Sequence, residues 1–344
     1  MSEPHGGEAR ASVALPSPAR DPAVPVAAAE GAPAWPAHHV IAFAVMVAVL
    51  AAVPFVKQIY PVFVMKALCF ALFACAFNVL IGYVGLLSFG HAAFLGLAGY
   101  TSAHAAKVWG APPEAAILLG TAAAGGLGVV LGALAIRSRG IYFANITLAF
   151  AQMIYFFSLQ AKFTGGEDGI QAVPRGTLLG LVDLRNNYAM YYVVLAVFLA
   201  GFLFIYRIIH SPFGQVLKAI RENEARAISL GYRTERYKLA AFVLSAALSG
   251  LAGATKAIVF QNASLTDVQW QMSGEVVLMT LLGGLGTVFG PTVGAFLIIW
   301  MQFYLADLGG WVTITQGIIF VICVLAFRRG IMGELEAWLR GRRK

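Results

Sequence analysis

Several polar side chains stand inside long apolar runs of this sequence, where groups able to bind a solute or move a proton are unexpected. Polar groups at membrane depth are costly, so they usually face protein or water. A hydroxyl, an amide, an imidazole or a carboxylate could hydrogen-bond a zwitterionic or amide-bearing solute, and could equally lock helices together. Both interpretations stay open for Asn78, Ser88, His91, Asn145, Thr147, Gln152 and Glu275.

Ser88 and His91 are three residues apart, so we expect them to share a helix face if that stretch is helical. No catalytic arrangement accompanies these groups: the sequence contains no H-E-x-x-H, no G-x-S-x-G and no phosphate-binding G-x-x-x-x-G-K-[S/T]. Glu275 has no second acid on its helix, and the three cysteines lack metal-ligand spacing. We expect no enzymatic activity, no metal and no cofactor in this chain.

The composition favours a membrane protein. Of 344 residues, 60% are apolar and 12% are charged, whereas a soluble domain has about 25% charged residues. The net charge of +8 comes from basic residues gathered in a few loops and at the C-terminus, which is typical of membrane orientation rather than of nucleic-acid binding. Residues 1–38 are rich in Ala and Pro and lack the pattern of a signal peptide, so we expect a disordered tail.

The apolar runs predict an all-α polytopic fold. A membrane span needs about 20 apolar residues, and the region 275–305 is interrupted near Gly283–Gly294, which predicts two short helices at 275–287 and 292–305. The other predicted spans are 40–56, 61–81, 84–106, 113–136, 140–160, 188–209, 238–260 and 311–327.

Basic residues near span ends favour the cytoplasm. They cluster at Arg137 and Arg139, in the loop 207–238, and after residue 327. Placing all three clusters on one side requires an even number of crossings between them. We therefore predict about ten crossings with both termini inside, a membrane domain over 39–330 and a basic cytoplasmic tail over 331–344.

Glycines interrupt one apolar segment in each half of the sequence, at 82–100 and 283–294. Such pairs of interrupted segments can mark a transport path and allow an internal inverted repeat. Close helix packing is the alternative, and it suits Gly128-x-x-x-Gly132 and Gly290-x-x-x-Gly294.

Residues 211–236 predict a helical hairpin at the membrane surface. Ser211 and Pro212 suit a helix start, apolar residues follow at helical spacing, and Gly231 suits the end of a second helix over Glu224–Leu230. We expect this hairpin to insert into a groove on a partner; the alternative is a solvated loop that only sets topology. The charged residues expected to point outward are Arg221, Glu222, Glu224 and Arg226.

The chain resembles the LivM-type permeases of branched-chain amino acid ABC importers over about residues 40–330. The stretches that carry the resemblance are "NVLIGYVGLLSFGHAAFLGLAGY", "RGIYFANITLAFAQM", "TGGEDGIQAVPR", "SPFGQVLKAIRENEARAISLGY" and "SGEVVLMTLLGGLGTVFGP". The resemblance implies that the hairpin couples to an ATPase through Pro212, Gly214, Arg221, Glu222, Glu224, Arg226 and Gly231. One departure is Arg226, which stands where the short coupling motif of other importers has alanine.

The resemblance also implies partners: a second, homologous permease forming a heterodimer, two cytoplasmic ATPase subunits that hydrolyse ATP, and a periplasmic binding protein that delivers the amino acid. The segment 161–187 could dock that binding protein or be an ordinary external loop. The implied location is the bacterial inner membrane. Alternative solutes are urea, short amides and aromatic acids. A stand-alone ion-coupled carrier, for which only Glu275 is a candidate coupling acid, and a structural membrane protein remain the other hypotheses.

Overall fold

The structure is a computed structural model that describes residues 37–55, 60–326 and 329–334. Most of the predicted N-terminal tail and basic C-terminal tail lies outside these ranges, so both stay predictions. The chain divides into a unit over residues 1–48 and a unit over residues 49–344. The described part of the first unit holds most of one helix. The second unit holds the end of that helix and all the other described elements.

The apolar helices of the described part match the ten predicted membrane segments, and the all-α polytopic fold class is confirmed. Five are long and apolar enough to span a bilayer: α2 with its π-helical continuation η2, α4, α5, α6 and α9. The other five have 14–17 residues, which at about 1.5 Å per residue is shorter than a bilayer core of about 30 Å. The ten are α1 (Ala37–Ala52), α2 (Pro61–Asn78), α3 (His91–Lys107), α4 (Pro113–Ala135), α5 (Ile141–Gln160), α6 (Asn187–His210), α9 (Thr234–Phe260), α10 (Trp270–Gly283), α11 (Gly290–Leu305) and α12 (Val312–Ala326).

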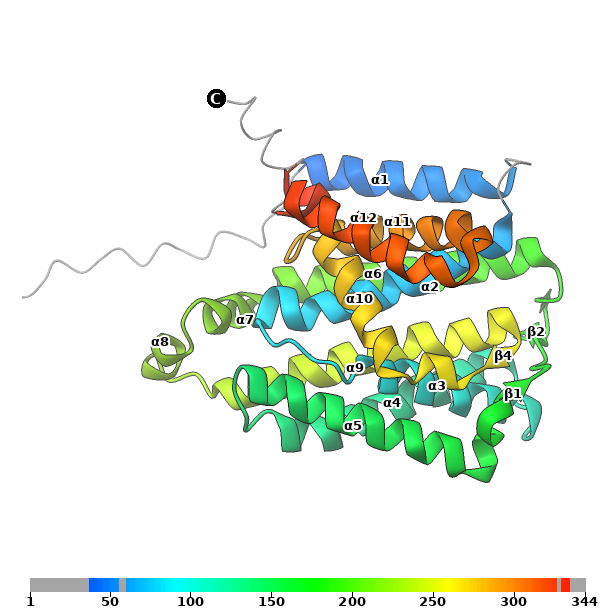
Figure 1. Cartoon of the computed structure of the whole chain (residues 1–344), viewed down its shortest axis with the longest axis horizontal. Coiled ribbons are helices and arrows are strands. Elements are labelled where there is room, and N and C mark those ends of the chain that lie inside the picture. Colours follow the sequence, from blue (N-terminus) through cyan, green and yellow to red (C-terminus); the bar gives the residue numbers. More distant parts are fainter. Residues whose placement is uncertain (1–36, 56–59, 327–328, 335–344) are drawn as a thin grey trace, which may run out of the picture. The chain divides into compact units, whose positions relative to one another are not determined.

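Two opposite ends of the helix bundle carry the remaining elements (Figure 1). The strand end holds two small antiparallel pairs, in which Ile170 pairs with Ala263 and Thr177 pairs with Asp183. The hairpin end holds α7 (Pro212–Glu222) and α8 (Glu224–Ser229). The strands are β1 (Ile170–Gln171), β2 (Thr177–Leu178), β3 (Val182–Asp183) and β4 (Asn262–Ala263); the short helices are η1 (Val53–Phe55), η2 (Val79–Val84), η3 (Lys162–Thr164), η4 (Gly166–Asp168), η5 (Leu265–Asp267) and η6 (Ala306–Trp311).

Small residues bring the central helices α3, α4 and α9 into close contact. A Cβ atom on Gly120 of α4 would stand 2.6 Å from the Ala98 carbonyl oxygen of α3. A Cβ atom on Gly128 would stand 2.6 Å from the Ala246 Cβ of α9, and one on Gly253 would overlap the Leu95 carbonyl oxygen. Close packing, one of the two roles expected of the glycines, is therefore confirmed for Gly128.

Helices α10 and α11 form a tight antiparallel pair, as the interruption of 275–305 predicts. A Cβ atom on Gly283 would overlap the Gly290 carbonyl oxygen, and one on Gly294 would overlap the Met279 carbonyl oxygen. The contacts pair residues that approach the break from both sides, which defines the antiparallel direction. The break itself covers residues 284–289 and reaches the hairpin end, because Gly286 lies beside Arg221 of α7.

The prediction of one helix over 84–106 is wrong at its start. Gly85 takes a left-handed conformation with φ of 81° and ends η2, and α3 begins only at His91. Ser88 therefore lies in a non-helical link and does not share a helix face with His91. The physical reason is that a left-handed residue cannot continue a right-handed helix.

Two of the three basic clusters meet at the hairpin end, and residues 329–334, the described part of the third, return to it. Arg139 lines a cavity together with Glu224 and Lys238. The chain after α12 returns to the same end, where Gly330 packs against Gly284. This arrangement agrees with the even number of crossings predicted between the clusters.

Candidate functional site

The hairpin forms because its sequence supplies helix caps and a buried apolar stripe. The Ser211 hydroxyl accepts a hydrogen bond from the Gly214 amide (3.3 Å), and Pro212 follows in the first turn. Leu217 and Ile220 are buried against the bundle. At the other end of the hairpin Gly231 has φ of 87° and closes α8, as predicted.

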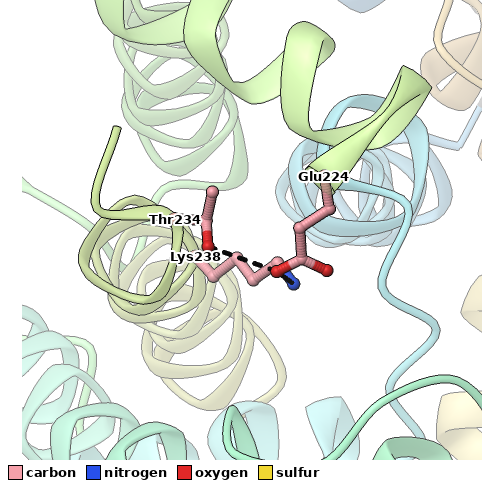
Figure 2. Close-up of polar contacts among 3 residues, drawn as sticks. All are labelled: Glu224, Thr234 and Lys238. Atoms are coloured by element: carbon pink, nitrogen blue, oxygen red, sulfur yellow. Dashed lines mark hydrogen bonds and ion pairs between the residues drawn. The ribbon is translucent and has the colours of Figure 1, made fainter. Parts of the chain in front are cut away.

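Glu224 ties the hairpin to α9 (Figure 2). Its Oε1 accepts hydrogen bonds from Lys238 Nζ (2.6 Å) and from the Thr234 hydroxyl (3.2 Å). The Lys238 side chain is 8% exposed and that of Glu224 is 26% exposed. The expectation that Glu224 points outward is wrong, because a lysine fourteen residues later holds it; Glu222 and Arg226 are exposed, as predicted.

The charge of this pair shifts the titration of Glu224. Partial burial by itself raises the pKa of Glu224, but the hydrogen bond and charge of Lys238 oppose it. With the Thr234 hydroxyl and the Arg139 charge added, the pKa of Glu224 lies below its ordinary value. Glu224 is therefore ionised at neutral pH, and the ion pair is closed.

Arg221 reaches from α7 into the break between η2 and α3. Its Nη1 donates a hydrogen bond to the Gly82 carbonyl oxygen, and its side chain lies 3.1 Å from where a Gly85 Cβ would stand. The outward orientation expected for Arg221 is thus only partly met: the residue is exposed overall, yet its guanidinium group contacts the bundle. It lines a cavity of about 420 Å³ together with Gly82, Lys218 and Gly286.

Asn78 joins the two interrupted segments to each other. Its side-chain amide donates to the Thr287 carbonyl oxygen (2.9 Å), and its Oδ1 accepts from the Gly286 amide (3.0 Å). A Cβ atom on Gly82 would overlap the Asn78 side chain, so only glycine permits this approach. We call these five residues, Asn78, Gly82, Arg221, Gly286 and Thr287, the junction.

The junction is suited to transmitting motion. One arginine on a surface helix holds the backbone of a π-helical turn, and one asparagine holds that turn to the loop between α10 and α11. Both contacts end on irregular backbone, where helices can change direction at low cost. A displacement of α7 therefore acts on two membrane helices at once.

Ser88, His91 and Thr147 lie near one another, and each hydrogen-bonds within the protein: Ser88 inside the link before α3, and the other two to neighbouring elements. The Ser88 hydroxyl accepts from the Gly90 amide (3.2 Å), and the Thr147 hydroxyl accepts from the Phe89 amide (3.1 Å). All three side chains are buried. These contacts supply partners for backbone groups in the link that precedes α3.

His91 bonds to α9 through Ser245. The His91 Nε2 lies 2.9 Å from the Ser245 hydroxyl, which itself donates to the Ala76 carbonyl oxygen (2.6 Å). Because that hydroxyl proton is already used, His91 Nε2 carries a hydrogen and is the donor to Ser245. Its Nδ1 has no hydrogen-bond partner among the described residues, and edge-on Phe77 and Phe94 rings pack around it.

The other candidate solute contacts are dispersed. Asn145 is exposed on α5. Gln152 is half-buried and lines a cavity of about 190 Å³ with Tyr155 and Trp270. Glu275 accepts a hydrogen bond from Gln302 (3.2 Å). The structure thus does not gather the seven candidates into one site, and their contact with a solute stays a prediction.

Sequence reasoning missed a group of charges near the strand end. Lys256 of α9 forms an ion pair with Asp267 of η5, and Lys66 of α2 and Glu275 of α10 stand on helices that pack against each other. With Gln302 these four residues form what we call the charged cluster. The sequence did contain a signal for this cluster. Lys66 and Lys256 each stand inside a long apolar run, 61–81 and 238–260.

No group of three or more His, Cys, Asp or Glu side chains suitable for a metal ion occurs within residues 37–55, 60–326 and 329–334. The described residues instead provide contacts that link the hairpin to the membrane helices, and polar side chains that can hydrogen-bond.

Comparison with known proteins identifies relatives along most of the chain. Residues 62–327 match the family described as "Branched-chain amino acid transport system / permease component". The high-affinity branched-chain amino acid transport system permease protein LivM of Escherichia coli is 28% identical over 74% of this chain and 65% of that protein. LivM of Salmonella typhimurium gives the same identity and coverage.

A relative named for another solute also matches. The ribose import permease protein RbsC of Bacillus subtilis is 29% identical over 52% of this chain and 58% of that protein. No solved structure matches the chain significantly. The matched part spans about two thirds of the length of the LivM proteins, 65% in each. Because the family match covers well over half of the chain, the protein belongs to the family of branched-chain amino acid transport system permease components.

Proposed function

We propose that this chain is a membrane permease subunit of an ATP-driven importer of branched-chain or related amino acids. Separate ATPase subunits bind the hairpin α7–α8 and move it, and the solute path opens to one side of the membrane at a time. A second, homologous permease completes the path, and a periplasmic binding protein delivers the solute at the strand end. The chain itself supplies no catalytic step.

The junction carries the proposal. A surface hairpin with a buried apolar stripe and an exposed charged face suits a groove on a partner, and Arg221 connects that hairpin to both interrupted segments. This link gives motion of an attached ATPase a direct route to both interrupted segments, beyond the chain connections of the hairpin to α6 and α9. Family membership supports the same interpretation.

The choice of solute rests on the names of the relatives. The two LivM proteins are named for branched-chain amino acids and RbsC for ribose. Urea, short amides and aromatic acids remain alternatives among the solutes. A stand-alone ion-coupled carrier is the alternative mechanism, and it requires no ATPase.

Replacing Arg221 with alanine tests the coupling. The assembled importer is purified with its ATPase subunits, reconstituted in vesicles, and assayed for ATP hydrolysis and uptake of labelled L-leucine. A hydrogen bond to a charged group contributes about 1.5–3 kcal/mol, so we expect R221A to keep its ATPase subunits and lose about tenfold or more of its uptake.

The matched control is Arg137→Ala, because Arg137 is exposed and follows the end of α4, outside both the hairpin and the segment 161–187. R137A is expected to transport like the parent. Equal uptake by R221A and the parent would refute the role of the junction. Transport by the purified chain without any ATPase would refute the importer and favour the carrier.

We further propose that the hairpin end faces the cytoplasm of a bacterial cell and that both termini lie there. The basic clusters gathered at this end support that orientation. Single cysteines at Ala225 and at Leu181, both exposed, report the two ends. In intact spheroplasts an impermeant thiol reagent should label L181C and leave A225C unlabelled; the reverse pattern would invert the topology.

A further inference from the structure

We propose that Lys66 and Glu275 hold the two charged ends of a zwitterionic amino acid, in a site between α2, α9, α10 and α11 near the strand end. The inference rests on the proposed importer function and deepens it by naming where the solute binds and which groups select it.

The charged cluster is assembled from four helices and one short turn. The Lys66 and Lys256 ammonium groups lie 6.0 and 5.8 Å from the centre of the same Phe70 ring. Within the same cluster, Gln302 of α11 donates to Glu275 of α10 (3.2 Å). The Phe63 and Phe303 rings, 5.1 Å apart, bring α2 and α11 together beside the cluster.

The cluster contains one satisfied pair and one unsatisfied pair of charges. Lys256 and Asp267 neutralise each other. Lys66 makes no hydrogen bond and no ion pair within the described part of the chain, and Glu275 bonds only to the neutral Gln302 there. One positive and one negative group therefore remain, on two helices that pack against each other, and they form no ion pair with one another.

The position of these charges argues against contact with lipid. Lys66 and Glu275 are each the sixth residue of their helices, which places them about 7–8 Å below the helix start at 1.5 Å per residue. A lysine can extend to the membrane surface from such a depth, but the shorter glutamate side chain cannot. Charges at this depth usually face water or protein, and no described residue forms an ion pair with either charge, so we infer that this face lines an aqueous path.

A zwitterion fits the unsatisfied pair better than a simple ion does. Its carboxylate would accept from the Lys66 ammonium while its own ammonium donates to the Glu275 carboxylate. A lone anion or cation would satisfy one group and leave the other unpaired. An apolar groove of about 540 Å³ lined by Phe63, Trp300 and Phe303 begins one turn from Lys66 and suits an aliphatic side chain.

Cysteine accessibility tests this site in the assembled importer. A Cβ atom on Gly274, next to Glu275, or on Gly126 of α4 would meet no atom within 4 Å, so neither substitution crowds the fold. Gly126 lies on a helix with exposed Leu118, Leu119, Val129 and Val130, a lipid-facing surface. In membrane vesicles a charged, impermeant methanethiosulfonate should label G274C and not G126C, with the parent chain as the blank for its native cysteines.

Protection by solute then tests the chemistry. Saturating L-leucine, without ATP, should slow labelling of G274C about tenfold, whereas leucinamide, which lacks the carboxylate, and 4-methylpentanoate, which lacks the ammonium, should not. Adding Lys66→Gln or Glu275→Gln should abolish protection, and adding Lys66→Arg should keep it. Three outcomes would each overturn the proposed site. They are no labelling of G274C, labelling that leucine does not slow, and protection by leucine that persists in the K66Q variant.

The same vesicles separate this inference from the proposed function. ATP-driven uptake of L-leucine by the parent complex tests the importer. Uptake without protection at Gly274 rejects only the site, whereas absence of uptake counts against the importer, whatever the labelling shows.

Discussion

The ion pair between Glu224 and Lys238 gives a quantitative prediction for the hairpin. In the variant Glu224→Gln the side chain keeps an acceptor oxygen and loses its charge, so the Lys238 ammonium, 8% exposed, has no anionic partner left at this position. Breaking a fully buried pair costs about 3–5 kcal/mol, and an exposed pair contributes about 0–1 kcal/mol. Because Glu224 is 26% exposed, we expect a loss of about 2 kcal/mol.

Hydrogen–deuterium exchange of the purified complex measures this loss locally. The amides of Ala227 and Leu230 bond to the carbonyl oxygens of Asn223 and Arg226, and they exchange when α8 opens. A change of about 2 kcal/mol corresponds to about thirtyfold in the opening equilibrium, so α8 should exchange about thirtyfold faster in E224Q.

Two variants make the result specific to the pair. Glu222→Gln removes an exposed carboxylate at the end of α7 and should leave exchange of α8 unchanged. Combining E224Q with Lys238→Met should restore part of the protection, because the unpaired charge is then gone. An exchange rate in E224Q equal to that of the parent would refute the idea that this pair holds α8 on α9.

The remaining predictions concern pH and packing. The pKa of Glu224 lies below its ordinary value of 4.5, so the stabilisation of α8 by ionised Glu224 should be complete above about pH 4.5 and disappear as the pH falls through the lower folded-state value. The measurement is the ratio of α8 amide exchange rates in E224Q and in the parent, corrected for intrinsic rates. This ratio should stay constant from about pH 5 to 8 and shrink below that range. Gly253→Ala places a Cβ atom on the Leu95 carbonyl oxygen and should cost about 1–3 kcal/mol or more, lowering the temperature at which detergent-solubilised protein stops being monodisperse. Gly126→Ala, in open space, should keep or raise that temperature, and equal behaviour of the two variants would contradict the packing described between α3 and α9.

Helix positions were predictable because apolar length is a local property. The span predicted at 188–209 corresponds to Asn187–His210, and the break of 275–305 occurs where glycines interrupt the apolar run. The hairpin caps were also predictable, since Ser211 and Gly231 act through neighbouring backbone. An internal inverted repeat stays a prediction.

Long-range partners were not predictable from one sequence. Helical spacing placed Glu224 on an exposed face, but the nearness of Lys238 depends on how α8 folds back onto α9. Lys66 and Glu275 are more than two hundred residues apart, and only the tertiary fold packs their helices, α2 and α10, against each other. Asn78 was noted as a polar residue at membrane depth, yet its bond to Gly286 required the tertiary fold.

The glycine contacts between α10 and α11 give this pair a mechanical property. With backbone touching backbone at Gly283 and Gly294, and with Gln302 fastened to Glu275 near the far end, the two helices have little room to slide or splay. They form one rigid unit, and the loop 284–289 at its tip lies beside Arg221. A displacement of that tip would therefore move the pair as a unit, including Glu275 and Gln302 at its other end.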